Sequence, residues 1–461
     1  MEHVVIIGGG PGGYESALVA AQLGAQVTVV DRDGLGGSAV LTDCVPSKTL
    51  IATADLMTSV QGAGELGVSL AEAPDVDVRA HLGVVNRRVK DLARAQSVDI
   101  AARLEREGVR VISGAGRLDG PGVVVADLTD GGTETLEAQT ILVSTGAHPR
   151  VLDTAKPDGE RILTWEQVYD LPELPETLVV VGSGVTGAEF AGAYLALGSE
   201  VVLVSSRDRV LPGEDVDAAE VLEAVFKRRG MTVMSRTRME SVQRSGDGVR
   251  VTLTDGRVVE GSHCLLALGS LPNTAGMGLQ EAGVELDDGG FIRVDGVSRT
   301  SLRGVYAAGD CTGVLMLASV AAMQGRIAMA HALGDAVQPL NQLEVSSNVF
   351  TAPEIATVGY TQKDVDDGEV DAKAIMLPLA GNARAKMQGI HDGFVKLFCR
   401  PGTGIVIGGV VVGPAASEFI HPVSLAVACS LTVDQVAHAF TVYPSISGSV
   451  AEAARRLHRR A

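Results

Sequence analysis

Short apolar runs that end in glycine-rich turns recur along the chain. The first run, residues 4–7, has four consecutive apolar positions, which is typical of a strand buried on both faces. The segment 8–24 that follows has apolar positions at helical spacing, and a second strand-like run, residues 26–30, ends at Asp31. The pattern therefore predicts a strand, a glycine turn, a helix and a second strand at the start of the chain.

The same order of elements recurs in the middle of the chain. Strands are predicted at residues 178–181 and 200–204, with a glycine turn and a helical segment between them. Three more segments each carry an apolar strand into a glycine turn, at 141–150, 263–274 and 300–310. One chain therefore contains two similar units.

The last part of the chain, from about residue 341, has a different pattern. Strand-like runs at 395–399 and 404–412 alternate with a helical run at 416–431, which is consistent with an α+β domain. Together these patterns predict an α/β protein with two Rossmann-like dinucleotide-binding domains and a C-terminal α+β domain.

Length and composition narrow the classes of protein. The 461 residues suggest two to four domains, and the 56 glycines have no periodic arrangement, so we expect them at specific turns. The net charge of −18 argues against nucleic acid as the main partner. An anionic ligand therefore needs a local site. Neither a calcium loop nor a cluster with zinc-ligand spacing is found, so no metal is predicted.

Cysteine usage and hydropathy indicate the compartment. The five cysteines are scattered, at Cys44, Cys264, Cys311, Cys399 and Cys429. Without CxxC spacing they predict neither a disulfide framework nor a zinc ribbon, and they indicate a reducing, cytoplasmic environment. The first apolar run lacks the features of a targeting segment, and the most apolar later stretch, 404–413, is about half the ~20 residues of a membrane span. We expect a soluble protein.

Gly8, Gly10 and Gly13 fit the pattern G-x-G-x-x-G between the first predicted strand and helix. In such a turn the first glycine makes the bend, the second lets backbone approach a pyrophosphate, and the third lets helix and strand pack closely. Asp31 follows at the end of the second strand, where a carboxylate can hold a ribose hydroxyl. An ordinary glycine-rich loop is the alternative, but the strands, the helix and the acid agree on a dinucleotide site.

The second unit has Gly182, Gly184 and Gly187 in the same pattern, but Ser205 at the position of the acid. Further hydroxyl and guanidinium groups follow it, at Ser206, Arg207 and Arg209. Without a carboxylate to bond a free 2′-hydroxyl, this site is suited to the 2′-phosphate of NADP. The alternatives are that the arginines are ordinary surface residues, or that NAD is used as well.

Asp310 stands at the end of the predicted strand in 300–310. In open parallel sheets ligands bind at the carboxyl ends of the strands, so this carboxylate is expected to face the ligand crevice. A plain turn aspartate is the alternative.

These motifs, in this order, resemble the flavoprotein disulfide reductases, the class I pyridine nucleotide-disulfide oxidoreductases that include dihydrolipoamide dehydrogenase. The resemblance covers nearly the whole chain and rests on GGGPGG at Gly8, GGSAVLTDCVPSK at 36–48, STG at Ser144, GSGVTGAE at Gly182, ALGSLPNT at Ala267, VYAAGD at Val305 and VFTAPEIATVGYT at 349–361.

The family fold implies four segments and a homodimer. The implied boundaries are 1–152 for the first part of the FAD-binding domain, 153–272 for the NAD(P)-binding domain, 273–340 for the central second part of the FAD-binding domain, and 341–461 for the dimerisation domain.

The resemblance also implies which residues contact the cofactors, FAD and NADP, with NAD also plausible. These residues are Gly8, Gly10, Pro11, Gly12, Gly13, Asp31, Arg32, Ser38, Lys48, Gly116, Thr145, Gly146, Gly182, Gly184, Val185, Thr186, Gly187, Ser205, Ser206, Arg207, Gly269, Gly309, Asp310 and Ala318. Lys48 and Glu189 match the family's ion pair beside flavin N5, where a fixed cation stabilises reduced flavin and the carboxylate holds the lysine. A purely structural salt bridge is the alternative.

The chain departs from the family pattern at the disulfide machinery. Members that reduce disulfides carry a C-x4-C pair, but here the outer position is Ala39 and only the inner Cys44 remains. The family's C-terminal histidine and glutamate, which activate the outer thiolate, are replaced by Tyr443 and Gly448, although Pro444 stays. Tyrosine, with a reference pKa near 10, cannot shuttle protons at pH 7 as imidazole does. We therefore predict that the chain does not carry out disulfide exchange.

The family motifs that are intact predict an FAD-dependent NAD(P)H:quinone oxidoreductase, most like the quinone reductase branch of the family. Candidate catalytic residues are Lys48, Glu189, Cys44 and Tyr443. Cys44 is either a thiolate under the flavin or a small buried residue, and Tyr443 either bonds a quinone oxygen or fills the vacated histidine site.

Two other functions stay open at this point. One is a soluble pyridine nucleotide transhydrogenase, and the other is a non-catalytic flavin-bound redox sensor, against which the intact glycine turns weigh. Four arginines near the end of the chain, Arg455, Arg456, Arg459 and Arg460, are either a solvated basic tail or a weak attachment to an anionic membrane.

Overall fold

The computed structural model describes residues 2–68 and 78–458, which form two compact units. Unit 1 comprises Met1–Thr49, Asn86–Arg150 and Leu268–Asn341, and unit 2 comprises Leu50–Val85, Val151–Ala267 and Gln342–Ala461. The division of the chain into four segments is finer than this one and stays a prediction.

Unit 1 is built on a seven-stranded sheet in the order β17-β6-β1-β2-β3-β4-β5. The parallel strands are β1 (His3–Ile7), β2 (Gln26–Asp31), β3 (Arg110–Leu118), β6 (Thr140–Val143) and β17 (Val305–Ala307). The sheet is extended by β4 (Val123–Leu128), which is antiparallel to β3, and by β5 (Thr133–Glu137), which is antiparallel to β4. A two-stranded ribbon pairs β7 (Ala147–Pro149) with β16 (Ser270–Pro272).

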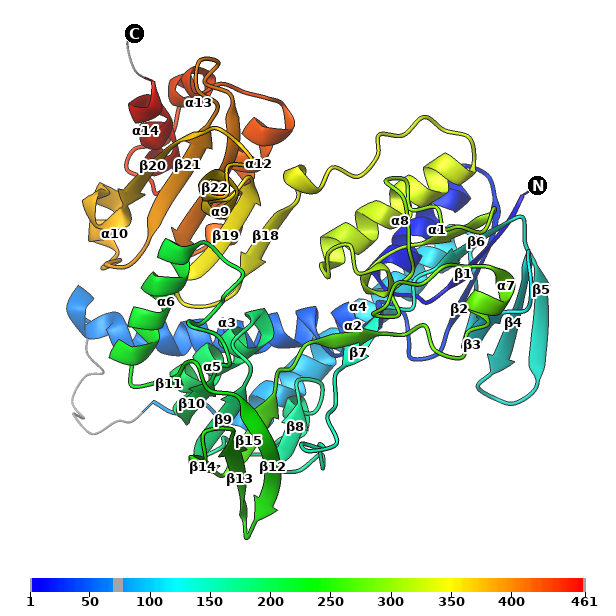
Figure 1. Ribbon diagram of the computed structural model, residues 1–461, viewed down its shortest axis with the longest axis horizontal. Coiled ribbons are helices and arrows are strands. Elements are labelled where there is room, and N and C mark those ends of the chain that lie inside the picture. The colour runs from blue at the N-terminus through cyan, green and yellow to red at the C-terminus, as the bar shows by residue number, and fades with distance from the viewer. Residues whose placement is uncertain (1, 69–77, 459–461) are drawn as a thin grey trace. The chain divides into compact units, whose positions relative to one another are not determined.

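Both faces of the parallel part of this sheet are covered. Because side chains alternate along a strand, Val5 and Ile7 of β1 enter one hydrophobic core and Val4 and Ile6 enter the other. Helices α1 (Pro11–Gln22) and α8 (Ala318–Ala332) pack against each other and against this sheet (Figure 1). Two short helices, α2 (Gly37–Leu41) and α7 (Leu279–Ala282), complete unit 1. The continuous apolar runs of the sequence are thus buried on both faces, as predicted.

Two long helices contain residues of both units. They are α3 (Cys44–Gly62) and α4 (Leu82–Arg106).

Unit 2 contains a second parallel sheet, in the order β11-β10-β9-β15-β8. Its strands are β8 (Ile162–Thr164), β9 (Thr177–Val181), β10 (Glu200–Val204), β11 (Thr232–Met234) and β15 (His263–Leu266), with helices α5 (Val185–Leu197) and α6 (Val216–Arg228). A three-stranded antiparallel sheet, β12 (Met239–Ser245), β13 (Gly248–Leu253) and β14 (Val258–Gly261), accompanies it. The strands predicted at 178–181 and 200–204 are confirmed.

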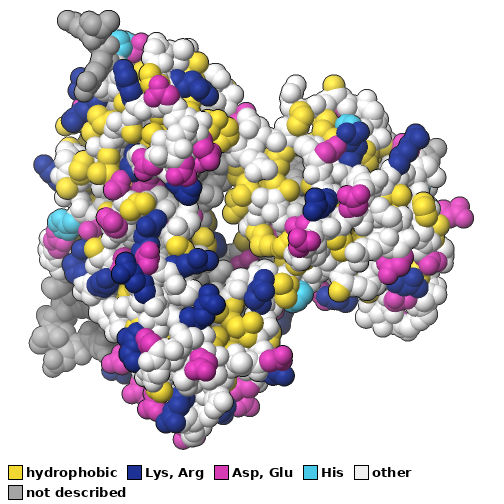
Figure 2. Space-filling view, viewed as in Figure 1, with side chains coloured by type: hydrophobic (Ala, Val, Ile, Leu, Met, Phe, Trp, Pro, Cys, Tyr) yellow, Lys and Arg dark blue, Asp and Glu magenta, His cyan; other side chains and the backbone are white. Residues whose placement is uncertain are grey.

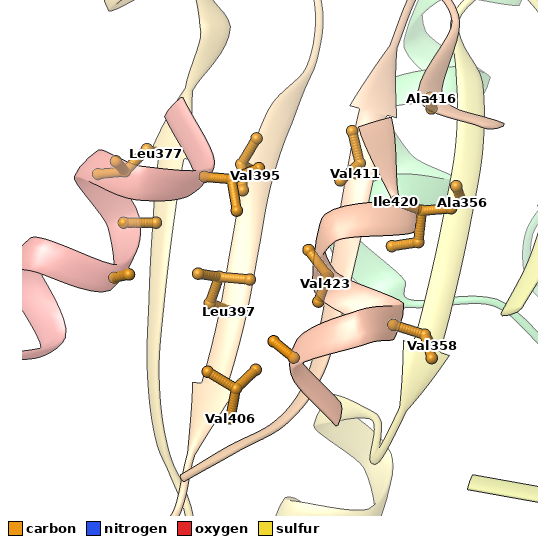
Figure 3. Packing of buried hydrophobic residues seen from close by; sticks show 14 of the residues in the cluster. Ala356, Val358, Leu377, Val395, Leu397, Val406, Val411, Ala416, Ile420 and Val423 are labelled. Carbon is orange, nitrogen blue, oxygen red and sulfur yellow. The ribbon is translucent and has the colours of Figure 1, made fainter. Parts of the chain in front are cut away.

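The C-terminal part of unit 2 is an antiparallel sheet in the order β18-β19-β22-β21-β20. Its strands are β18 (Ser346–Val349), β19 (Glu354–Gly359), β20 (Lys373–Pro378), β21 (Phe394–Cys399) and β22 (Val406–Gly413). The helices of this part are α9 (Gln362–Asp366), α10 (Ala383–Met387), α11 (Ala416–Phe419), α12 (His421–Ala428), α13 (Val433–His438) and α14 (Gly448–Leu457). Ile420 and Val423 lie over strands that carry Ala356, Val358 and Val411 in the core of this domain (Figure 3). The predicted α+β domain is confirmed.

One sequence prediction in this domain is wrong. The run at 416–431 was expected to be one helix, but it forms α11 and α12, which meet at Ile420, and the second helix ends at Ala428. Pro422 has no N–H to donate to the carbonyl four residues earlier, so an uninterrupted helix would lose that hydrogen bond. Ser430, with φ of +52°, turns the chain away after the second helix.

No helix among residues 2–68 and 78–458 is both long and apolar enough to cross a bilayer. On the face shown in Figure 2, acidic, basic and hydrophobic side chains are interspersed over most of the surface.

Candidate functional site

The glycine turn after β1 is shaped by the backbone around it. Gly8 has φ of +103°, and a Cβ there would lie 2.2 Å from the carbonyl oxygen of Ser144. A Cβ on Gly13 would lie 1.8 Å from the carbonyl oxygen of Gly8. At Gly10 the nearest atom to an added Cβ is the Cα of Gly37 at 3.9 Å, so space is free there. The first and third glycines thus make the turn, and the second leaves room for a ligand.

The first turn of α1 is open to an anion. Gly10 is the N-cap residue, and no side chain caps the helix, which begins at Pro11 and continues through Gly12. The N–H groups and the positive end of the helix dipole are therefore available to a phosphate.

Asp31, at the end of β2, holds this turn in place. One carboxylate oxygen accepts the N–H of Gly9 at 2.6 Å, and the other accepts the N–H groups of Asp33 at 3.0 Å and Gly34 at 2.5 Å. Burial raises the pKa of Asp31, and these three hydrogen bonds oppose that effect. The sequence predicted a ribose contact for this residue, and the structure adds a role in ordering the loop.

A groove of about 310 Å³ runs beside this turn within unit 1. Of the predicted residues it is lined by Gly8, Asp31, Arg32, Gly116 and Thr145. The groove is also lined by residues that were not predicted to contact a cofactor, among them Ala115, Arg117, His148, Asn273 and Met277.

Asn273 organises one wall of the groove. Its side-chain N–H donates to the carbonyl of Thr145 at 2.8 Å, and the Thr145 hydroxyl donates to the carbonyl of Asn273 at 2.7 Å. The Asn273 side-chain oxygen lies 2.7 Å from Nδ1 of His148. Asn273 belongs to the motif ALGSLPNT, so the signal was present in the sequence, but only the three-dimensional structure shows what it contacts.

Asp310 lies three residues after the end of β17, as the first residue of a short 3₁₀ helix (Asp310–Thr312). The preceding Gly309 donates its N–H to the side chain of Gln324 on α8 at 2.8 Å, which fixes the turn. Burial raises the pKa of Asp310 to about 6, and the charge of Asp43 adds to the effect. A desolvated carboxylate of this kind gains from hydroxyl donors, which fits the ribityl part of a flavin nucleotide.

Four more predicted cofactor contacts lie in unit 1. Ser38 is an exposed residue of α2, Gly146 follows β6, Gly269 precedes β16, and Ala318 is the first residue of α8.

The second glycine turn repeats the geometry of the first. A Cβ on Gly182, whose φ is +113°, would lie 2.1 Å from the carbonyl oxygen of Ala267, and a Cβ on Gly187 would lie 1.9 Å from that of Gly182. Around Gly184 no atom lies within 4 Å of an added Cβ. Helix α5 starts at Val185 and Thr186 without a side-chain cap, so its N-terminus is open to a pyrophosphate.

Ser205 has a structural role beside this turn. It is fully buried, and its hydroxyl lies 2.6 Å from that of Ser183 and accepts the N–H of Arg207 at 3.1 Å. Ser206 and Arg207 are exposed, and Nε of Arg209 is buried without a hydrogen-bond partner in the described part of the chain. The groups that fit a 2′-phosphate are therefore Ser206 and the two arginines, while Ser205 orders the loop.

The predicted catalytic residues lie on two helices and a loop. Cys44 is the first residue of α3 and is half-buried, and Lys48 follows one turn later on the same face. Glu189 in α5 is only 3% exposed, and its Oε1 accepts the N–H of Phe350 at 2.8 Å. Lys48 and Glu189 belong to different units, and their ion pair stays a prediction.

The positions of the missing disulfide machinery hold residues without proton-shuttle chemistry. Ala39 is half-buried in α2, and Gly448 is the first residue of α14. Tyr443 is 86% exposed and lines a groove of about 400 Å³ together with Asn382, Pro444 and other residues of the C-terminal domain. All five cysteines are free. The described residues contain no group of three or more His, Cys, Asp or Glu side chains that could hold a metal ion.

At the end of the chain, the basic tail is partly neutralised. Arg455 and Arg456 both pair with Glu452 at 2.7 Å. Arg459 and Arg460 lie outside the described residues.

Comparison with known proteins gives matches along the whole chain. NAD(P)H dehydrogenase (quinone) from Mycobacterium tuberculosis is 56% identical over 464 residues, which cover 99% of this chain and 94% of that protein. Dihydrolipoyl dehydrogenase from Zymomonas mobilis is 32% identical, with 99% of this chain and 98% of that protein covered. The crystal structure of LpdA from Mycobacterium tuberculosis, 55% identical, superposes with a TM-score of 0.95 and covers 100% of both chains.

Family descriptions match the two main parts of the sequence. Residues 2–325 match the pyridine nucleotide-disulphide oxidoreductases, and residues 345–454 match the dimerisation domain of the same proteins. The predicted fold class and the resemblance are thereby confirmed. The chain belongs to the pyridine nucleotide-disulphide oxidoreductase family.

Proposed function

We propose that this protein is an FAD-dependent NAD(P)H:quinone oxidoreductase that works without disulfide exchange. The observation that carries the proposal is that both dinucleotide turns are intact and open at Gly10 and Gly184, while the outer thiol position holds Ala39. The base positions hold Tyr443 and Gly448. The relative that is 56% identical bears the name NAD(P)H dehydrogenase (quinone), which supports a quinone as acceptor.

The residues of unit 1 suit FAD. When bound, FAD would carry electrons from the nicotinamide to the acceptor. The N-terminus of α1, left open at Gly10, would hold the pyrophosphate. Asp31 and Asp310 would accept hydrogen bonds from sugar and ribityl hydroxyls, and Lys48 would supply a fixed positive charge. The N–H of Phe350 holds the buried Glu189 carboxylate in one orientation, as its proposed role beside Lys48 requires.

NADPH is the proposed coenzyme, with NADH used less efficiently. The first residue after β10 is Ser205, where an acid would repel a 2′-phosphate, and the next two residues, Ser206 and Arg207, are exposed. The buried and unpartnered Nε of Arg209 supports an anion at this position, because an unpaired donor gains most from a charged acceptor.

The acceptor site is proposed to be completed by a second copy of the chain. Tyr443 is exposed in the domain that matches the dimerisation domain, and a phenol can donate a hydrogen bond to a quinone oxygen. A homodimer in which Tyr443 reaches the partner's acceptor site is therefore proposed. The five free cysteines support a reducing compartment such as the cytoplasm.

Steady-state assays of the flavin-loaded protein test this function. NADPH and NADH are each combined with a quinone such as menadione, with thio-NADP, with lipoamide and with glutathione disulfide. We expect turnover with the quinone and none with the two disulfide substrates, and the Cys44→Ser variant should keep quinone turnover. Turnover with disulfides would contradict the proposal.

The same assays separate the alternatives. Fast hydride exchange between NADPH and thio-NADP with no quinone turnover would identify a transhydrogenase. Bleaching of the flavin by NADPH without turnover on any acceptor would identify a redox sensor.

A further inference from the structure

A lysine is buried inside unit 2, far in sequence from its acidic partners. Nζ of Lys396 on β21 donates to Asp215 at 2.8 Å and to Asp217 at 2.5 Å. The side chains of Lys396 and Asp215 are 4% and 1% exposed, and the ammonium group lies 5.9 Å from the ring centroids of Phe394 and of Phe398. A charge in such a place is costly unless it is paired, so these three residues depend on one another.

The lysine points away from the core of the C-terminal domain. Its neighbours in the strand, Val395 and Leu397, belong to the hydrophobic core beneath α12 and α14. Because side chains alternate along a strand, Lys396 lies on the opposite face of the sheet. There it meets the N-terminal end of α6, which belongs to the parallel-sheet part of unit 2.

Asp215 uses both of its carboxylate oxygens. Oδ1 caps α6 by accepting hydrogen bonds from the N–H groups of Asp217 at 3.0 Å and Ala218 at 3.3 Å, and Oδ2 accepts the hydrogen bond from Nζ of Lys396. Burial lowers the pKa of Lys396 and the two carboxylates raise it, with a net shift upward, so the lysine is charged at neutral pH. The position of this helix cap is thus set by a residue of the C-terminal sheet.

The segment that ends at this cap is the loop 205–215, which carries Arg207 and Arg209. Its first residue, Ser205, is bonded to Ser183 of the glycine turn, and the N–H of Leu211 donates to the Ser183 carbonyl at 2.8 Å. The loop is therefore fastened to the glycine turn at its start and middle, and to Lys396 at its end.

Loss of the lysine charge would affect this loop first. Without Nζ, Asp215 would be a buried carboxylate beside a second acid, Asp217. Turning the Asp215 side chain toward water would relieve this unfavourable burial of charge. The same movement would remove the cap of α6 and displace the end of the loop.

We propose that Lys396 is a positioning residue for coenzyme binding: through Asp215 and Asp217 it holds the loop 205–215 in the conformation that binds the adenosine ribose and its phosphate. The inference rests on the proposed NAD(P)H site of unit 2. It makes the C-terminal domain a part of the coenzyme site, in addition to its role in dimerisation.

The test compares Lys396→Met with a matched control, Asp392→Asn. Asp392, which precedes β21, forms an ion pair with Arg228, the last residue of α6. The control therefore removes an ion pair between the C-terminal domain and α6 at the end of the helix away from the loop. The probes are 2′,5′-ADP and 5′-ADP, titrated calorimetrically into the flavin-loaded protein.

We expect Lys396→Met to weaken binding of 2′,5′-ADP about tenfold and to raise the KM for NADPH by a similar factor, with kcat at saturating NADPH changed less than about threefold. Asp392→Asn should change the same Kd less than about twofold. Lys396→Arg, which keeps the charge, should recover part of the affinity.

A lower unfolding temperature with an unchanged Kd for 2′,5′-ADP would overturn the proposal, because the lysine would then be merely structural. If Lys396→Met does not fold, Asp217→Asn gives a milder variant, since Asp217 is 46% exposed. That variant should weaken 2′,5′-ADP binding about threefold, and an unchanged Kd would again overturn the proposal.

Failure of the proposed function would look different. Absence of quinone turnover would remove the proposed acceptor but leave the titrations unchanged. If the wild-type protein binds 5′-ADP as tightly as 2′,5′-ADP, the proposed preference for NADPH is wrong. The role of the lysine is then tested with 5′-ADP: weaker binding by Lys396→Met would support it, and an unchanged Kd would overturn it.

Discussion

At the scale of single residues, the two glycine turns show that the glycines of one motif do different work. Gly182 and Gly187 are glycine because the backbone of the protein leaves no space for a side chain. Gly184 has space that the protein does not fill. The motif thus contains two positions at which the surrounding backbone requires glycine and one position that is left open.

This difference predicts opposite outcomes for the same substitution two residues apart. Gly182→Ala places a Cβ 2.1 Å from the Ala267 carbonyl oxygen at φ of +113°, so we expect it to lower the free energy of unfolding by about 3 kcal/mol. Gly184→Ala should change that free energy by less than about 1 kcal/mol but raise the KM for NADPH about tenfold. Urea denaturation and steady-state kinetics measure the two effects. An unstable Gly184→Ala variant with an unchanged KM would contradict the assignment.

Asp310 predicts a pH dependence of stability in the flavin-free protein. The pKa of its carboxyl is about 6 in the folded chain against 3.8 as the ordinary value, so the folded state binds the proton more tightly. Its stabilising contribution is present below pH 4 and is lost as the pH rises through 6. Between pH 4.5 and 7 this amounts to about 2 kcal/mol.

In the Asp310→Asn variant this contribution is absent. We therefore expect its free energy of unfolding to decline less between pH 4.5 and 7 than that of the wild type, by about 2 kcal/mol in urea denaturation of the flavin-free protein. Parallel curves for the two proteins would show that Asp310 does not titrate in this range. The variant should also bind FAD more weakly in a fluorescence titration.

At the scale of elements, the sequence predicted the strands of both parallel sheets well, because runs such as 178–181 are apolar throughout and end at glycine. The sequence was less informative where a contact with residues far away in the chain determines the environment of a side chain. The strand at 395–399 was expected, but nothing local shows that Lys396 is buried against acids about 180 residues earlier. The hydrogen bond between the hydroxyls of Ser205 and Ser183 is likewise not visible in the sequence. The break before Pro422 could have been predicted from the missing N–H.

The contact between helices α1 and α8 carries a prediction about flavin retention. A Cβ on Gly325 of α8 would lie 2.3 Å from the carbonyl oxygen of Gly12 and 2.4 Å from the hydroxyl of Ser16, both on α1. Gly325→Ala must therefore push α1 away, although alanine favours the helix by about 1 kcal/mol. We expect a loss of about 2 kcal/mol in stability and purification with less bound flavin, measured by the ratio of absorbance at the flavin band to that of protein.

Gly62→Ala is the control for this change. Gly62 ends α3 with a right-handed helical conformation, and nothing lies within 4 Å of an added Cβ. This variant should be as stable as the wild type or more stable by up to about 1 kcal/mol, with full flavin content. Equal flavin content in both variants would show that the α1–α8 contact does not control the FAD site.

At the scale of the whole molecule, the family match and the surface of the C-terminal domain lead to the same expectation of a dimer. Residues 345–454 match a dimerisation domain, and within them Phe440 is fully exposed while Val442 and Tyr443 are 78% and 86% exposed. Large apolar side chains gathered in this way mark a surface that is covered in the assembled protein. The same segment carries Tyr443, at the position of the family's histidine, so the proposed acceptor site would depend on dimerisation.

Phe440→Asp tests this link. Since the side chain is fully exposed in the single chain, the substitution should leave the unfolding temperature of the protomer within about 2 °C of the wild type, but it places a charge in the proposed interface. We expect sedimentation velocity to show monomers and quinone turnover to fall at least about tenfold, while NADPH still bleaches the flavin. Val258→Asp, at a position 49% exposed on β14 outside the dimerisation domain, should remain dimeric and active. If Phe440→Asp forms active dimers, the segment lies outside the interface. If the variant is monomeric and fully active, the acceptor site is complete within one chain, and Tyr443 of a second copy has no part in it.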